Sequence, residues 1–182
     1  MGFVDHQTLR SGTPLTASDY IWLAALGAAE RGPITLDSIA SAVESLAGCL
    51  WQPVFEVIAD NVDEMAKGGF LDEQDGRIML TPPGRFCLAQ LLARPVHAPL
   101  SAFGQVGVRL KMAFLDLLPK PSRQRQIQAL IVAYECEIAS RSTRCGAWPL
   151  SGMLGRGWLD HQMDTLEDSL HLLRKSARME ET

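Results

Sequence analysis

The sequence predicts a mainly α-helical fold with one small β-hairpin: a winged helix-turn-helix domain followed by a C-terminal α-helical dimerisation region. Three observations predict it. Apolar residues recur at three- and four-residue steps along most of the 182 residues. Two short apolar runs flank a Gln-Asp-Gly turn at residues 74–76, as in a hairpin. The last helical stretch alternates its apolar residues by four and three, which is the pattern of paired helices.

The composition is that of an ordinary globular protein. Apolar residues make up 47% of the chain and charged residues 21%, which is enough to build a core. No apolar run reaches the length that spans a bilayer, and the first residues lack the features of a signal peptide, so a cytoplasmic protein without a membrane partner is expected. The four cysteines are scattered singly, which predicts buried thiols and neither a metal site nor a cofactor.

The first two helices follow from their caps and breakers. Ser18 is the expected N-cap of a helix that ends at Gly32-Pro33. Thr35 is the expected N-cap of the second helix, which ends at Gly48. The apolar stripe of the second helix consists of Leu36, Ile39, Val43 and Leu46.

A third helix begins near Pro53 and ends at Gly68-Gly69. Its two faces differ in kind. Helical spacing predicts a buried stripe of Phe55, Ile58, Val62 and Met65. The opposite face carries Glu56, Asp60, Asp63 and Glu64, with Lys67 as its one cation.

The remaining elements complete the order. A hairpin is predicted over residues 70–80, and Thr81 caps a helix that opens with Pro82. Helix–helix–helix–hairpin–helix over residues 18–93 is the order of a winged helix-turn-helix. A proline-broken linker follows at residues 94–103, and the C-terminal helical region at 104–177 holds helices near 104–118, 122–142 and 157–177.

The last of these helices predicts a homodimer. Its apolar residues form a heptad seam of Leu159, Met163, Leu166, Leu170 and Leu173. The alternative is a helix that packs within its own chain. A glycine-rich segment at residues 152–157 does not follow a strand, so it predicts a joint and not a phosphate-binding loop.

Together these residues resemble the PadR-like transcriptional regulators. Trp51 occupies the family's tryptophan position, and Gly69-Phe70 stands for its glycine-leucine pair. The run Leu80 to Arg85, "LTPPGR", is similar to the leucine-threonine-x-x-glycine-arginine that opens the helix after the wing. The resemblance covers residues 18–177 and implies a homodimeric regulator whose last long helix builds the dimer.

The polar half of the family's pattern has changed sign. Residues 53–75 contain seven acids and one lysine. Glu56 stands where the family has glycine, Asp60 where it has proline, and Asp63 and Glu64 where it commonly has lysine and arginine. Because DNA affinity depends on cations that displace counterions, weakened DNA binding is expected. The candidate DNA contacts are Asn61, Lys67, Arg77 and Arg85. The alternative is a module that does not bind DNA and uses the acidic face on a basic protein partner.

Catalytic patterns are missing from the sequence. It has no nucleophile elbow, phosphate loop or zinc-binding His-Glu-x-x-His, so no enzymatic activity is expected. Trp148 and Trp158, beside the expected dimer helix, are candidates for an apolar ligand pocket, and core packing is the alternative.

Overall fold

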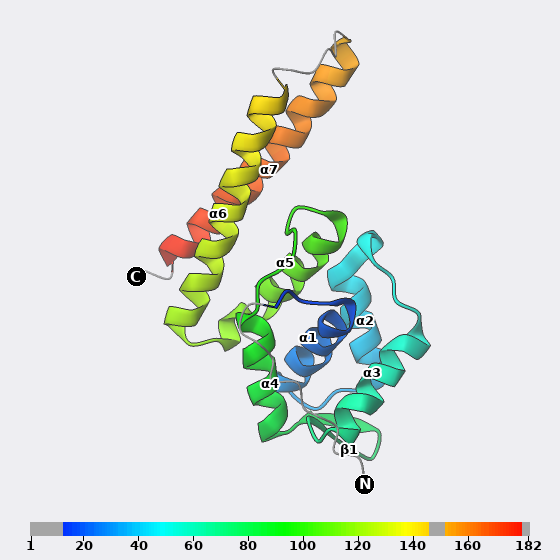
Figure 1. Ribbon diagram of the computed structural model, residues 1–182. Coiled ribbons are helices and arrows are strands. Elements are labelled where there is room, and N and C mark those ends of the chain that lie inside the picture. Colours follow the sequence, from blue (N-terminus) through cyan, green and yellow to red (C-terminus); the bar gives the residue numbers. More distant parts are fainter. Residues whose placement is uncertain (1–12, 146–151, 180–182) are drawn as a thin grey trace. The chain divides into compact units, whose positions relative to one another are not determined.

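The computed structural model describes residues 13–145 and 152–179 and divides the chain into two compact units (Figure 1). The N-terminal unit comprises Met1–Leu118 and the C-terminal unit Pro119–Thr182. The N-terminal unit contains α1 (Ala17–Glu30), α2 (Leu36–Ala47), η1 (Gly48–Leu50), α3 (Phe55–Lys67), β1 (Leu71–Gln74), β2 (Arg77–Leu80), α4 (Pro82–Ala93), α5 (Ala102–Phe114) and η2 (Leu115–Leu117). The C-terminal unit contains α6 (Lys120–Cys145) and α7 (Met153–Met179). The predicted fold class, mainly α-helical with one small β-hairpin and a helical C-terminal region, is confirmed.

Helix α1 is the centre of the N-terminal unit. It packs against α2, α3, α4 and α5, and it is apolar on most sides because it is surrounded. Its N-cap is Thr16, which forms a reciprocal capping box with Asp19: the Thr16 amide donates to Asp19 Oδ2 at 2.7 Å and the Asp19 amide to Thr16 Oγ1 at 3.3 Å. The expectation that Ser18 caps this helix is therefore wrong, because Thr16 has the acid three residues on.

The other two predicted caps are confirmed. Thr35 Oγ1 accepts from the Ser38 amide at 3.2 Å, and Thr81 Oγ1 accepts from the Gly84 amide at 3.1 Å. In the hairpin between α3 and α4, Leu71 pairs with Leu80 and Gln74 with Arg77. The wing turns at Asp75 and Gly76, whose φ angles of 51° and 70° are the left-handed pair of a type I′ turn.

Helix α5 belongs to the N-terminal unit, although the sequence places it in the C-terminal region. It packs on α1 and α2 and buries Val106, Leu110 and Phe114 there. Gly107 allows a close approach, since a Cβ at this position would lie 2.3 Å from the Tyr20 hydroxyl oxygen. The division between the units consequently falls after Leu118, beyond the linker expected at 94–103.

A buried polar cluster joins three segments of the N-terminal unit. Arg94 is 5% exposed, and its guanidinium donates to Asp19 Oδ1 at 2.8 Å and to the carbonyl oxygens of Thr13 at 2.9 Å and Pro14 at 2.7 Å. The Lys111 ammonium, on α5, donates to the Arg94 carbonyl oxygen. Burial, and then the positive charge of Arg94, lowers the pKa of Lys111 to about 8.

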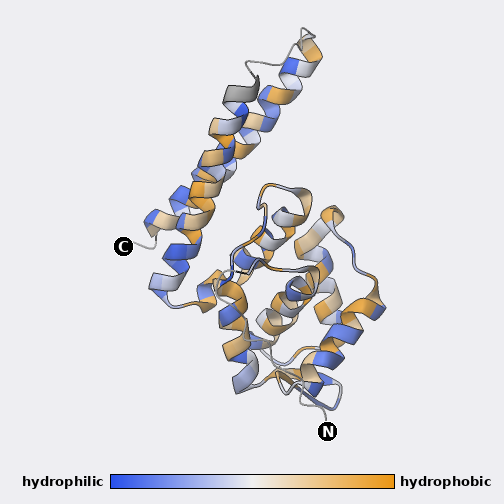
Figure 2. Ribbon diagram, in the orientation of Figure 1, coloured by the Kyte–Doolittle hydropathy of each residue, from blue (hydrophilic) through white to orange (hydrophobic). Residues whose placement is uncertain are grey.

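The C-terminal unit is a helical hairpin in which α6 and α7 lie side by side. Both helices alternate apolar and polar residues along their length (Figure 2). Ile127, Leu130, Ile131 and Tyr134 of α6 are buried, as are Leu170 and Leu173 of α7. Helix α7 begins at Met153, so the expected glycine joint is partly helical. No helix in the described residues combines the length and apolar character that a membrane span requires.

Candidate nucleic-acid interface

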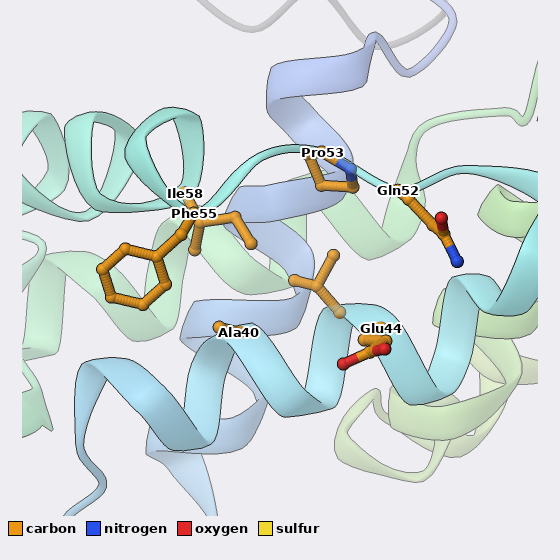
Figure 3. Close-up of a pocket in the computed structure, with 7 residues that line it drawn as sticks. Ala40, Glu44, Gln52, Pro53, Phe55 and Ile58 are labelled. Carbon is orange, nitrogen blue, oxygen red and sulfur yellow. The ribbon is translucent and has the colours of Figure 1, made fainter.

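The third helix of a winged helix-turn-helix is the one that approaches DNA. In α3, Ile58, Val62 and Met65 are buried as predicted. The prediction for Phe55 is wrong: its side chain is 46% exposed. Phe55 is the first residue of α3, and it lines an open cleft beside α2 instead of the core (Figure 3).

The outward face of α3 is acidic in the structure as in the sequence. Glu56, Asp60, Asp63 and Glu64 are all exposed. The Lys67 ammonium forms an i,i+4 ion pair with Asp63, and this hydrogen bond, together with the Asp63 charge, raises the pKa of Lys67. The only cation of α3 therefore lies against a carboxylate of the same helix.

Asn61 does not point outward. Its side chain is 9% exposed, with Oδ1 accepting from Trp22 Nε1 at 3.2 Å and Nδ2 donating to the Val57 carbonyl oxygen at 2.8 Å. Both ends of the amide are engaged, and they join α3 to α1. Asn61 therefore acts here as a packing residue, and its amide is not presented to a base edge.

The two candidate arginines differ in their surroundings. Arg77 begins β2 at the wing and is exposed, and no ion pair within residues 13–145 and 152–179 engages it. The Arg85 Nε atom, on α4, lies 2.9 Å from Glu30 Oε2, while 67% of the Arg85 side chain is exposed. Arg77 offers an unengaged cation, and Arg85 one that is already partly neutralised by Glu30.

An apolar cleft at the start of α3 was not predicted. Its volume is about 330 Å³, and Figure 3 shows it between α2 and the segment that enters α3. It is lined by Ala40, Val43, Glu44, Gln52, Pro53, Phe55 and Ile58. Val54 and Val57, beside it, are 61% and 43% exposed. The available signal was that these two valines fall outside the buried stripe of the helix.

The predicted dimer seam lies along α7. Leu170 and Leu173 are buried within the single chain, and Leu159, Met163 and Leu166 are half-buried. A second line of α7 is open: Trp158, Leu172 and Met179 are 61%, 63% and 72% exposed, at intervals of whole heptads.

In the described part of the chain, neither cavity is lined by a tryptophan that was predicted to form a ligand pocket. Trp148 lies outside that part, and Trp158 is exposed and lines neither the cleft beside α3 nor a second cavity at the start of α6. Among the described residues, no group of three or more His, Cys, Asp or Glu side chains is placed to hold a metal ion.

Comparison with known proteins gives a family match over most of the chain. Residues 11–177 match the family described as "Putative AphA-like transcriptional regulator". No curated protein sequence matches. Among solved structures, Bacillus subtilis PadR is 14% identical, covering 93% of this chain and 99% of its own, with a TM-score of 0.42. The Vibrio cholerae virulence activator AphA is 13% identical, covering 88% of this chain and 94% of its own, with a TM-score of 0.40.

Proposed function

The chain belongs to the AphA-like family of transcriptional regulators, and on that premise we propose that it regulates transcription in the cytoplasm as a homodimer that binds duplex DNA weakly. The observation that carries the proposal is the family match over residues 11–177, on a chain whose first unit has the winged-helix order. DNA contact falls to the exposed cations nearest the wing, Arg77 and Arg85. Such contacts position a protein on the phosphates without reading bases.

The acidic face of α3 sets the strength of this binding. Carboxylates brought near phosphates repel them, and each neutralised charge removes on the order of 1 kcal/mol of repulsion at the surface. We expect the double variant Glu56→Gln, Asp60→Asn to bind the promoter duplex of its own gene about tenfold more tightly than the natural chain. Fluorescence anisotropy at low salt measures the affinity.

A matched control makes the same change of charge elsewhere. Asp164→Asn, Asp168→Asn neutralises two exposed acids of α7 and should leave DNA affinity within about twofold. Equal gains in DNA affinity for the two double variants would show an effect of net charge alone. If neither variant gains affinity, the proposal that α3 lies near the bound DNA is wrong.

The dimer is proposed to form through the C-terminal unit. The exposed line of Trp158, Leu172 and Met179 leaves large apolar side chains in water, which a second copy would cover. Leu159, Met163 and Leu166, being half-buried, can contribute at its edge. Two-fold association of one helical hairpin with another is the simplest closed arrangement.

Two neighbouring leucines separate dimerisation from folding of the hairpin. Leu172→Glu changes a side chain that is 63% exposed in the single chain, so we expect a monomer by light scattering with helix content unchanged. Leu173→Glu buries a charge and should reduce the circular-dichroism signal of the helices as well. A Leu172→Glu protein that remains dimeric would rule out this line of α7 as the interface.

A second function has one observation in its favour. The exposed carboxylates of α3 would attract a basic protein, and Lys67, its single cation, is already paired with Asp63. In this function the winged-helix unit is a protein-binding module, and α3 is its contact surface.

A further inference from the structure

The cleft between α2 and α3 gives this second function a specific site. We propose that it docks a protein segment that carries an apolar anchor side chain flanked by lysine or arginine. This inference rests on the second function proposed above and adds the place and the chemistry of the contact.

Most of the residues that line the cleft are apolar. Ala40, Val43, Pro53, Phe55 and Ile58 supply five of its seven lining residues, and only Glu44 and Gln52 are polar. Its volume of about 330 Å³ lies at the lower end of the range for ligand pockets, about 300–1,000 Å³. Figure 3 shows Glu44 below the cleft on α2, with Pro53 and Gln52 above it on the entering segment.

Exposed apolar side chains extend the cleft into a surface. Val54, Phe55 and Val57 are 61%, 46% and 43% exposed, and they lie within four consecutive residues at the start of α3. Burial of apolar surface favours association, and a few anchor side chains carry most of the binding energy of an interface. These residues form the apolar centre of the proposed surface.

Charge decides which partner fits this centre. Residues 36–67 contain six carboxylates and a single cation, Lys67, which is paired with Asp63. Glu44 lines the cleft, and Glu56 and Asp60 lie on the exposed face of α3. Carboxylates of α2 and α3 beside an apolar centre complement a basic amphipathic segment, the kind of ligand that lays its apolar face in a groove between helices.

Duplex DNA fits the same surface poorly. Each base pair presents two phosphates, and the only apolar group on the major-groove edge is the thymine methyl. The three carboxylates Glu44, Glu56 and Asp60 would face phosphates without a free cation on either α2 or α3. The basic segment is therefore favoured over DNA at this place, and the two would compete for α3.

The test uses the full-length chain and two fluorescent peptides. One is a helical peptide of leucine and lysine with leucine on one face, and in the other serine replaces every leucine. We expect the leucine peptide to bind at least about tenfold more tightly than the serine peptide. The serine peptide keeps the charge and loses the apolar anchor. Amide shifts in the ¹⁵N spectrum should map the contact to residues 40–58.

Two alanine variants then locate the anchor. Phe55→Ala should lower the affinity for the leucine peptide about tenfold. Phe86→Ala removes a phenylalanine of α4 that is 67% exposed and does not line the cleft. The affinity of this variant for the leucine peptide should be unchanged. The double variant Glu56→Gln, Asp60→Asn should lower the affinity for both peptides about fivefold. Thermal melts of each variant check that the fold is retained.

The outcomes separate the site from the function it rests on. If acid neutralisation weakens both peptides while Phe55→Ala binds as the natural chain does, the cleft is excluded and the acidic protein-binding face stands. If neither peptide binds at millimolar concentration while duplex DNA does, both fail. Amide shifts confined to α6 and α7 would likewise overturn the inference.

Discussion

Gly84→Ala is expected to destabilise the N-terminal unit by about 3 kcal/mol, at the upper end of the cost of overpacking a core. A Cβ on Gly84 would lie 2.0 Å from the Phe70 carbonyl oxygen and 2.6 Å from Leu80 Cδ1. The leucine methyl can move, but the carbonyl is part of the backbone. It also accepts from the Thr81 hydroxyl at 2.9 Å and the Thr81 amide at 3.2 Å, so relief of the clash would disturb the two hydrogen bonds that hold Thr81, the N-cap of α4.

Urea unfolding followed by circular dichroism measures this loss. The control is Gly157→Ala in α7, where an added Cβ would meet no atom within 4 Å beyond its chain neighbours and the backbone of its own helix. Alanine is the better helix former there, and this variant should gain about 0.5–1 kcal/mol. A Gly84→Ala protein within about 0.5 kcal/mol of the natural chain would show that α4 can shift away from the wing.

The sequence motif around Gly84 illustrates what spacing can and cannot predict. A threonine followed by proline predicted the start of α4, because a hydroxyl at that position caps free amides whatever surrounds it. The need for glycine was not predicted, since it comes from the close approach of Phe70, which precedes the hairpin. A helix cap can be predicted from neighbouring residues. A contact between residues on either side of the hairpin cannot.

The same distinction explains the results on α3. The exposed carboxylates were predicted correctly because helical spacing alone puts Glu56 and Asp60 opposite the buried stripe. The orientation of Asn61 depends on Trp22, 39 residues earlier, whose indole N–H needs an acceptor. Phe55 has the spacing of a core residue, but the helix begins there, and its first turn faces the cleft.

In α7 the heptad period predicted a paired helix without identifying the partner. Leu170 and Leu173 have the spacing of a coiled-coil seam, and both are buried in the single chain, whose helix α6 lies alongside. A period of 3.5 residues specifies a contact with another helix and is the same within a chain or between chains. The open line at Trp158 and Leu172 became visible only from the exposure of each side chain.

Arg94→Met is expected to lower the free energy of unfolding of the N-terminal unit by about 3–5 kcal/mol at pH 7, as when one partner of a buried ion pair is removed. The Arg94 side chain is 6% exposed and that of Asp19 16%, so the Asp19 carboxylate would lose its ion-pair partner where water reaches it poorly. The Thr13 and Pro14 carbonyl oxygens would lose donors as well.

The control is Arg85→Met, which breaks an ion pair of similar length at a side chain that is 67% exposed. Surface ion pairs contribute about 1 kcal/mol or less, so this variant should unfold close to the natural chain. Equal losses in the two variants would mean that burial adds nothing to the Arg94 pair.

The dependence of stability on pH gives a second readout of Arg94. Burial first, and then the Arg94 charge, lowers the pKa of folded Lys111 to about 8, below its ordinary 10.5. Above pH 8 the unfolded chain therefore holds this proton more firmly than the folded one, and the unfolding free energy gains a contribution that rises with pH. In Arg94→Met burial remains but the charge is gone, so the rise should begin at higher pH. Urea unfolding between pH 7 and 8.5 tests this below the ordinary cysteine pKa of 9.0, and parallel curves for the two proteins would show that Arg94 does not act on Lys111.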